Sequence, residues 1–344
     1  MSGADPLLAI ARQLAREAEL PDPVRLDRLP GGKNNRVFRV TLADGSDAVL
    51  KSYHVDARDN RDRLGAEWAF LKFAWARGVR TIPVPLAADH GAQTALYSFV
   101  AGRRLDEDEI GIAQVQAAVD FVIAINAAPR DPMGLAPGSE ACFSLNDHLA
   151  TVDRRVARLG TLEPSAPFVV DAGRFVRETL MPAWSAVRVR IVDGARCAGI
   201  DPGQAMSSAD LCVSPSDFGF HNALVDDSGR VNFIDFEYAG RDDPAKLICD
   251  FFCQPEVPLP RKFCDLFREG TLAGLGVSQA THARCRLLLD AYRVKWICIM
   301  FNEFLPLGAA RRAFSSPELW SERCGQQLQK ARTKIAEIGI KGHE

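Results

Sequence analysis

The stretch VSPSDFGFHNALVDDSGRVNFIDFE, residues 213–237, decides how the rest of the chain is interpreted. Two short apolar runs, ALV and VNFI, flank the polar turn DDSGR, a pattern that predicts a β-hairpin. A hairpin returns its two ends to one place, so Asn222 before the first strand and Asp235 after the second should lie side by side. Converging amide and carboxylate oxygens suit a hard cation such as Mg²⁺. The stretch therefore predicts that Asn222 and Asp235 form a metal-binding pair.

A third polar residue, Asp217, precedes Asn222 by five positions. The spacing D-x4-N followed by I-D-F resembles the catalytic loop and metal-binding aspartate of the protein-kinase-like phosphotransferases. It is most similar to the aminoglycoside phosphotransferase family, which also covers choline, homoserine and fructosamine kinases. The resemblance implies that Asp217 is the catalytic base and that Asn222 and Asp235 are the metal ligands. Each residue alone is typical of a turn cap, and only their joint spacing favours a site.

Two features of this loop affect its comparison with kinase motifs. The letters Asp217-Phe218-Gly219 spell the name of the kinase metal motif, but the asparagine that follows places them in the catalytic loop. In the family a histidine usually stands two residues before the catalytic aspartate, where this chain has Pro215. The departure bears on loop geometry more than on chemistry. His221, beside Asn222, lies in a loop where the family often carries a histidine, and the sequence leaves its role open.

Composition narrows the function classes. The chain has 344 residues, which is enough for one large or two medium domains, and 47% of them are hydrophobic. Its net charge is −2. The balanced charge argues against a nucleic-acid partner. The N-terminal segment predicts an amphipathic helix over 5–19 rather than a signal peptide, and no apolar run is long enough to span a bilayer. We expect a cytoplasmic protein with no membrane partner. The nine scattered cysteines should be small core residues, not zinc ligands or disulfides.

The segment from Leu26 to Lys51 predicts a run of short strands. Within it, LPGGKNNRVFRVTL places Gly31, Gly32, Asn34 and Asn35 directly before an alternating strand. Glycine and asparagine tolerate unusual backbone angles, which lets main-chain N–H groups point at an anion. This is the pattern of a phosphate-covering loop, although an ordinary hairpin turn would look the same.

Lys51 ends the apolar strand AVLK, and a charge projecting from a buried strand needs an anionic partner. Glu67 supplies one from the helix predicted over 61–76, where apolar residues recur at three- and four-residue steps. The resemblance implies that Lys51 holds the nucleotide's α- and β-phosphates and that Glu67 holds Lys51. A surface lysine and a solvated glutamate are the alternative.

The segments IPVPLAAD and TALYSFVAGRRL predict two further strands, the second entering a bend at Gly102. By the resemblance, backbone groups near Ser98, Phe99 and Val100 bind the purine. The implied fold is α+β, protein-kinase-like and two-lobed. Residues 1–102 would form a small nucleotide-binding lobe, an antiparallel sheet with one main helix. Residues 103–344 would form a larger, mostly helical catalytic and acceptor-binding lobe.

Helices are predicted in the large lobe over 110–127, 145–159, 168–191 with a kink at Pro182, and in the C-terminal third. In the family an aspartate in the segment YAGRDDPAKLICDFF braces the catalytic loop. Asp250 is the first candidate and Asp243 the second, and either is also suited to capping a turn or a helix.

The elements follow one another in the order of the family from about Leu29 to Phe252. They imply Mg²⁺-dependent transfer of a phosphoryl group from ATP or GTP to a hydroxyl of a small acceptor. A sugar, an amino alcohol, another metabolite or an aminoglycoside fits equally, because acceptor pockets are built from variable helices and loops. No motif indicates the oligomeric state. Two alternatives remain open: a nucleotide-binding pseudokinase without transfer activity, suggested by Pro215, and metal-assisted hydrolysis, which leaves Lys51 and Glu67 unexplained.

Overall fold

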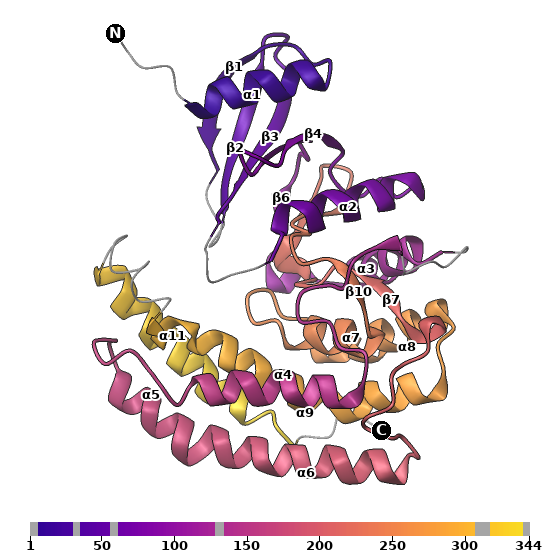
Figure 1. Ribbon diagram of the computed structural model, residues 1–344, viewed down its shortest axis with the longest axis vertical. Helices are drawn as coiled ribbons and strands as arrows, with labels where there is room; N and C mark the ends of the chain where they lie inside the picture. The colour runs from indigo at the N-terminus through magenta and orange to yellow at the C-terminus, as the bar shows by residue number, and fades with distance from the viewer. Residues whose placement is uncertain (1–5, 30–34, 56–60, 128–133, 307–316, 340–344) are drawn as a thin grey trace. The chain divides into compact units, whose positions relative to one another are not determined.

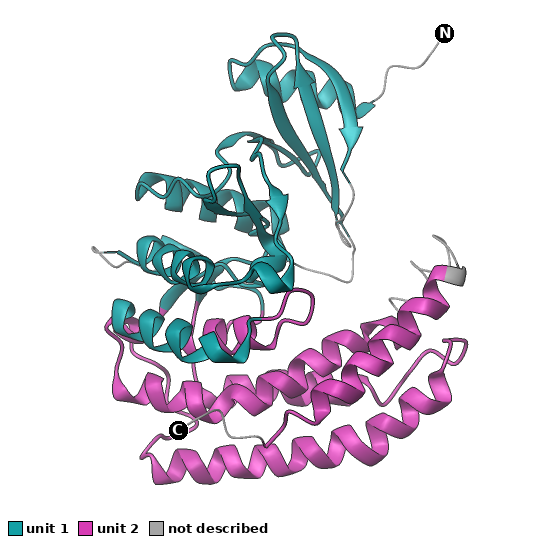
Figure 2. Cartoon of the chain, turned by 180° about the vertical axis from the view of Figure 1, so that it is seen from behind, with its two compact units in different colours: residues 1–139, 212–241, 259–275 teal, residues 140–211, 242–258, 276–344 magenta. Residues whose placement is uncertain are grey.

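The computed structural model describes residues 6–29, 35–55, 61–127, 134–306 and 317–339. Three residues of the predicted phosphate loop, Gly31, Gly32 and Asn34, lie outside these ranges. The chain forms two compact units, coloured separately in Figure 2. The first unit contains residues 1–139, 212–241 and 259–275, and the second contains residues 140–211, 242–258 and 276–344. Each unit is assembled from segments that are far apart in the sequence.

A five-stranded antiparallel sheet of order β1-β2-β3-β5-β4 opens the first unit (Figure 1). Its strands are β1 Pro23–Arg28, β2 Asn35–Leu42, β3 Asp47–Tyr53, β4 Pro85–Asp89 and β5 Thr94–Ser98. Helix α1, Pro6–Glu17, contributes Leu14 to a cluster that also holds Val40 and Leu50, all three fully buried. The helix and the strands confirm the elements predicted for this part of the chain.

Helix α2, Arg63–Ala76, is capped at its N-terminus by Asp62. The Asp62 carboxylate accepts a hydrogen bond from Gly65 N at 2.8 Å, which satisfies one of the free N–H groups of the first turn. Leu64, Phe70 and Leu71 are completely buried on its apolar face. Glu67 lies on the same face and is only 4% exposed, so a carboxylate is held inside the unit.

A second sheet carries the hairpin on which the sequence argument rests. Its three strands, in the order β6-β8-β9, are β6 Arg103–Arg104, β8 Ala223–Val225 and β9 Val231–Phe233. Gly102 before β6 has a φ of 148°, and a Cβ there would lie 2.8 Å from Val225 O, so the bend requires glycine. Asp226 closes the turn by accepting hydrogen bonds from Ser228 N at 2.9 Å and Arg230 N at 3.0 Å. The predicted hairpin is confirmed.

Two helices and a short sheet complete the first unit. The helices are α3 Ile112–Ile125 and α8 Cys264–Leu275, and they pack against each other. The sheet pairs β7, Cys212–Ser214, with β10, Gly240–Asp242. Because β7 ends immediately before the loop that holds Asp217, this pairing fixes where the loop begins.

The second unit is helical and is organised around α9, Gln279–Met300, which contacts α4, α6, α7 and α11. These helices are α4 Leu145–Arg158, α6 Met181–Cys197, α7 Pro244–Cys253 and α11 Pro317–Ile335. The helix predicted over 168–191 is interrupted: α5 Val169–Phe175 is followed by a π-helical turn, Val176–Leu180, and then by α6. The turn ends just before Pro182, whose missing N–H cannot bond to the preceding turn.

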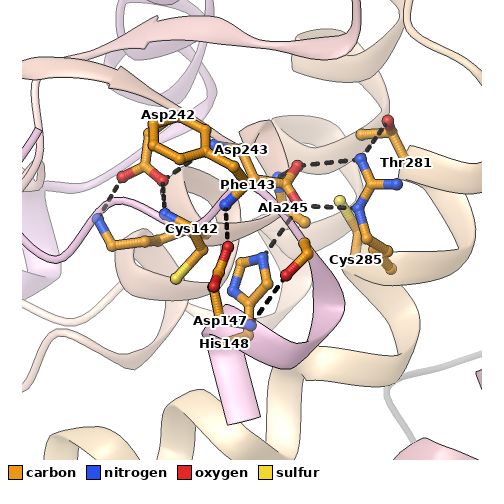
Figure 3. Close-up of polar contacts among 12 residues, drawn as sticks. Cys142, Phe143, Asp147, His148, Asp242, Asp243, Ala245, Thr281 and Cys285 are labelled. Carbon is orange, nitrogen blue, oxygen red and sulfur yellow. Dashed lines mark hydrogen bonds and ion pairs between the residues drawn. The ribbon is translucent and has the colours of Figure 1, made fainter. Parts of the chain in front are cut away.

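A buried polar network lies inside the second unit (Figure 3). Asp243 caps α7 by accepting from Ala245 N at 3.0 Å, which is the capping role that the sequence left open. The same carboxylate accepts from Arg284 Nε at 2.8 Å and lies 3.1 Å from His148 Nε2. Tyr292 OH lies 2.7 Å from the other ring nitrogen of His148. Since buried charges are costly without partners, this pairing is what permits their burial.

The network continues from the neighbouring aspartate. Asp242 accepts from Cys142 N at 2.9 Å and Lys246 Nζ at 2.5 Å. One helical turn further along α7, Asp250 accepts from Lys295 Nζ at 2.9 Å and from the indole of Trp296. Asp250 therefore ties α7 to α9. It is the residue that the sequence analysis named first as a candidate to brace the catalytic loop.

All nine cysteines are free thiols, and seven of them are buried, as expected for small core residues. Within the described ranges, no helix combines the length and the apolar composition that crossing a membrane demands.

Candidate active site

The loop that follows β7 places Asp217 through an unusual backbone. Ser216 has a φ of 46° and Asp217 a φ of 39°, in the left-handed region that most side chains avoid. Between this pair and β8, the Phe218 ring packs 5.5 Å from Phe121 and 4.9 Å from Phe233, centroid to centroid. With the phenyl ring anchored in the core, the Asp217 side chain remains 37% exposed.

The hairpin brings its two ends together as predicted. Asn222 O accepts from Ile234 N at 2.9 Å, which sets Asn222 beside the segment that ends in Asp235. The Asn222 amide nitrogen donates to Asp217 O at 3.1 Å, so its amide oxygen is the atom left for another ligand. Asp235 has a φ of 68°. Both carboxylates of the predicted site thus stand on left-handed backbone.

Lys51 joins β3, α2 and the hairpin. Its Nζ lies 2.6 Å from Glu67 Oε2 and 2.6 Å from Asp235 Oδ1. Burial alone would lower the pKa of Lys51, but the carboxylates of Asp235 and Glu67 hold it well above its usual value. Burial raises the pKa of Glu67, and the charge of Lys51 offsets only part of this increase. The expected Lys51–Glu67 pair therefore exists, and Lys51 is charged and shared between two carboxylates.

Two tyrosines extend this cluster, and the sequence analysis missed both. Tyr53 OH donates to Glu67 Oε2 at 2.6 Å, and Tyr97 OH lies 2.7 Å from Tyr53 OH. Burial, and then the charge of Glu67, raise the pKa of Tyr53 well above its ordinary value, so its hydroxyl remains a donor. Tyr53 stands two residues after Lys51 on the same strand, and the alternation of strand residues places both on one face. That spacing was the available signal.

A second contact unseen in the sequence connects Asn35 with Glu237, two residues after Asp235. The Asn35 amide nitrogen donates to Glu237 Oε2, and both side chains are buried. The same Glu237 oxygen lies 3.9 Å from Lys51 Nζ. Asn35 is the described residue of the predicted phosphate loop, and it starts β2. The contact therefore ties the end of that loop to the segment of the predicted metal ligand.

The metal-binding segment is also pinned to α2. Phe236 N donates to Glu67 Oε1 at 3.2 Å, and the Phe236 ring stacks on Phe70 with centroids 4.5 Å apart. Glu67 thus holds Lys51 with one oxygen and the chain beside Asp235 with the other. A displacement of α2 would move the two functional side chains together.

The three residues predicted to face the purine lie at the end of β5. Ser98 is engaged in the sheet, since its N–H donates to Val84 O at 3.0 Å and its hydroxyl accepts from Val84 N at 2.8 Å. Phe99 and Val100 follow the last strand residue, and the guanidinium of Arg39 lies 4.9 Å from the Phe99 ring. The assignment of these residues to a purine stays a prediction.

The donor set at the hairpin mouth fits Mg²⁺. Asp235 is 39% exposed and has one carboxylate oxygen on Lys51, so its other carboxylate oxygen and the Asn222 amide oxygen are the hard donors of this end of the hairpin. Mg²⁺ usually takes one or two protein oxygens and completes its shell with water and phosphate. No cluster of three or more histidine, cysteine or acidic side chains suited to a metal occurs among the described residues.

Comparison with known proteins agrees with this geometry. The sequence model of the phosphotransferase enzyme family matches residues 25–288. No curated protein sequence matches the chain significantly. Among solved structures, a choline kinase from Cryptosporidium parvum Iowa II is similar with a TM-score of 0.57 and 13% identity, over 98% of this chain and 96% of that one.

Two further structures show the same fold. A Plasmodium vivax ethanolamine kinase has a TM-score of 0.59 and 13% identity, over 95% of this chain and 88% of that one. An ADP-bound aminoglycoside phosphotransferase has a TM-score of 0.56 and 13% identity, over 96% and 99% of the two chains. These similarities confirm the predicted protein-kinase-like α+β fold.

Proposed function

Because the chain belongs to the phosphotransferase enzyme family, we propose that it transfers the γ-phosphoryl group of ATP or GTP to a hydroxyl group of a small molecule. The observation that carries the proposal is Lys51, buried and charged between Glu67 and Asp235 at 2.6 Å from each. Metal-assisted hydrolysis would give this lysine no task. In phosphoryl transfer it positions the nucleotide's phosphates.

The roles of the remaining residues follow from their positions. Asp217 accepts the hydrogen of the acceptor hydroxyl while the oxygen attacks Pγ; the bond from Pγ to the bridging oxygen breaks, and the nucleoside diphosphate leaves. The proton then passes from Asp217 to solvent. Asn222 and Asp235 would hold Mg²⁺, which supplies positive charge to the phosphates. Because little covalent chemistry is required of the protein, holding these groups in line supplies most of the acceleration.

Nucleotide binding falls, in this proposal, to residues 1–102. Asn35 and Lys51 face the phosphates, Glu67 holds Lys51 in place, and the backbone at Phe99 and Val100 faces the purine. Residues 103–344 carry the catalytic groups and the acceptor site. Structural neighbours include kinases named for choline, ethanolamine and aminoglycosides, so the acceptor we propose is an amino alcohol, an aminoglycoside or a related hydroxyl compound.

The first test is thermal unfolding with ATP and with GTP, each with and without Mg²⁺. A ligand that binds only the folded protein stabilises it by about 2.7 kcal/mol at a hundred times its Kd. We expect one nucleotide to raise Tm, and Mg²⁺ to raise it further. Asp235→Asn should remove the additional effect of Mg²⁺, whereas Asp227→Asn, on the exposed turn of the hairpin, should leave it unchanged.

The second test is turnover. The preferred nucleotide is incubated with choline, ethanolamine or an aminoglycoside, and formation of the nucleoside diphosphate is followed. Acceptor-dependent formation supports the proposal. Stabilisation by nucleotide without turnover on a broad hydroxyl panel would favour a nucleotide-binding protein without transfer activity, the alternative raised by Pro215. No stabilisation by either nucleotide would overturn the kinase assignment.

A further inference from the structure

His221 has no role in the transfer proposed above, yet it lies against the residue at its centre. Its Nε2 is 3.4 Å from Asp217 Oδ1. The imidazole is only 8% exposed, although Asp217 is 37% exposed. A buried ring at the edge of a half-open carboxylate limits where that carboxylate can turn. The contact therefore concerns the orientation of Asp217.

The surroundings of the ring decide which nitrogen carries the proton. Nδ1 of His221 is buried and has no hydrogen-bond partner in the described part of the chain. A proton on Nδ1 would leave an unpaired buried donor and would turn the Nε2 lone pair toward the carboxylate, and both are unfavourable. A proton on Nε2 sits on the nitrogen that lies 3.4 Å from Asp217 Oδ1 and leaves only a lone pair unpaired. The Nε2–H tautomer is therefore the stable neutral form.

The backbone around the ring is fixed independently of this contact. Arg104 of β6 donates to His221 O at 2.9 Å, and the next residue, Asn222, donates through its side chain to Asp217 O at 3.1 Å. Two consecutive residues of one short turn, Phe220–Asn222, thus hold Asp217 at its carbonyl and at its carboxylate. The turn acts on Asp217 from both ends.

We propose that His221 is a positioning residue for the catalytic base: its Nε2–H occupies Oδ1 of Asp217 and so presents Oδ2 to the acceptor hydroxyl. The inference rests on the proposed phosphoryl transfer. Without His221 the carboxylate rotates among several orientations, and only a fraction of them align the attacking oxygen with Pγ. The nucleotide's own contacts, through Lys51 and Asp235, do not involve His221.

Two substitutions separate positioning from folding. His221→Leu fills the buried space without a donor, whereas His221→Gln places an amide N–H near the former Nε2. Each is assayed with ATP and with GTP in the presence of Mg²⁺, with water as the acceptor, by release of inorganic phosphate. Loss of the proposed hydrogen bond to the Asp217 carboxylate predicts that His221→Leu lowers kcat roughly ten- to hundred-fold, with the nucleotide KM unchanged. His221→Gln should recover most of the loss.

A spectroscopic measurement reads the contact without turnover. In protein labelled with ¹⁵N-histidine, His221 is assigned by the signal that disappears in His221→Gln among the six histidines. We expect its Nε2 to carry the proton, and we expect Asp217→Asn to shift that signal. A proton on Nδ1, or a signal that ignores Asp217→Asn, would overturn the inference.

The kinetic outcomes distinguish the two proposals. If the wild-type protein releases phosphate and His221→Leu matches it, positioning by His221 is overturned and the proposed function stands. If both His221 variants lose activity and Tm to the same extent, the role is structural and the inference is also overturned. If the wild-type protein releases no phosphate and transfers none to any acceptor, the proposed function fails, and the positioning role with it.

Discussion

Lys51 is held by two carboxylates, and one of them depends on a tyrosine. Because Tyr53 OH donates to Glu67, Tyr53→Phe leaves a buried carboxylate oxygen with one donor fewer. Hydrogen bonds to charged groups contribute about 1.5–3 kcal/mol, so we expect the free energy of unfolding to fall by that amount. The nucleotide KM should rise as Glu67 loses its fixed position. Urea unfolding and steady-state kinetics measure both effects.

Tyr97→Phe is the matched control, since it removes a hydroxyl that contacts Tyr53 and not Glu67. Its cost should be about 1 kcal/mol, the usual contribution of a neutral hydrogen bond. Equal losses in the two variants would mean that the Tyr53 hydroxyl has no special part in holding Glu67.

Asp217 should be needed for turnover and not for nucleotide binding. Asp217→Asn keeps the shape of the side chain but removes the base, and general-base catalysis typically contributes roughly 10²–10⁴-fold. We therefore expect kcat to fall by about that factor, while the thermal stabilisation by nucleotide and Mg²⁺ is retained. A variant that keeps its turnover and loses nucleotide binding would contradict the assignment.

At this scale, sequence reasoning found residues whose spacing carries information and missed those joined only by folding. Lys51 pairs with Glu67 as expected, and Asn222 lies beside the segment that ends in Asp235. The contact of Asn35 with Glu237 joins residues 202 positions apart, and neither side chain belongs to a motif that predicts the other. Such pairs arise from the register of strands and loops, which one sequence does not encode locally.

Among the elements, β10 leaves little room for a larger side chain at Gly240. A Cβ on Gly240 would lie 2.4 Å from Gly138 N and 2.5 Å from Ala136 O, both backbone atoms. Gly240→Ala must therefore shift one of two chain segments, and overpacking of this kind costs about 1–3 kcal/mol. The urea midpoint reports the loss. Gly203→Ala is the control, since its nearest atom, Asp201 Oδ1, is 3.6 Å away; a similar loss there would contradict the steric explanation.

Helices and strands could be predicted from the sequence because each has a local period of apolar residues or a turn signal at its end. The hairpin at 223–233 follows from two apolar runs and the turn between them, and α2 follows from its apolar steps; its cap, Asp62, was not predicted. The π-helical turn over Val176–Leu180 was not readable. Proline marks a disturbance, but whether a helix bends, stops or widens depends on what packs against it.

For the whole molecule, the buried charges of the second unit predict how stability depends on pH. Burial opposes a charge on His148, but Cys142 and Asp243 raise the pKa of His148 to about 10. In the unfolded chain a histidine titrates near 6.5. The stabilisation from protonated His148 is therefore complete below pH 6.5, declines as the pH rises above that value and is lost above about 10.

The measurement is the free energy of unfolding of the wild-type protein minus that of His148→Gln, from pH 5.5 to 10.5. We expect the difference to be constant at first and then to shrink steadily across the upper range. His90→Gln, at an exposed histidine, should give a difference that is small at every pH. A wild-type advantage that grows with pH would show that His148 is neutral in the folded protein.

Local sequence patterns do not predict which segments of the chain make up each of the two units. The first unit recruits residues 212–241 and 259–275 from more than seventy positions beyond its N-terminal segment. A division of the chain at residue 102 was expected from the resemblance and stays a prediction. What the sequence does determine is the order of its motifs, because that order is a property of the chain before it folds.

Seven non-glycine residues of the described ranges have positive φ, and three of them, Ser216, Asp217 and Asp235, fall within one stretch of twenty residues. Such conformations cost of order 1–3 kcal/mol each, so glycine at Ser216 should make the protein more robust and is a starting point for engineering. The other two positions offer no such route, because their carboxylates are the reason for tolerating the strain. A search of uncharacterised structures for clustered left-handed aspartates would therefore locate catalytic loops of this kind without a single related sequence.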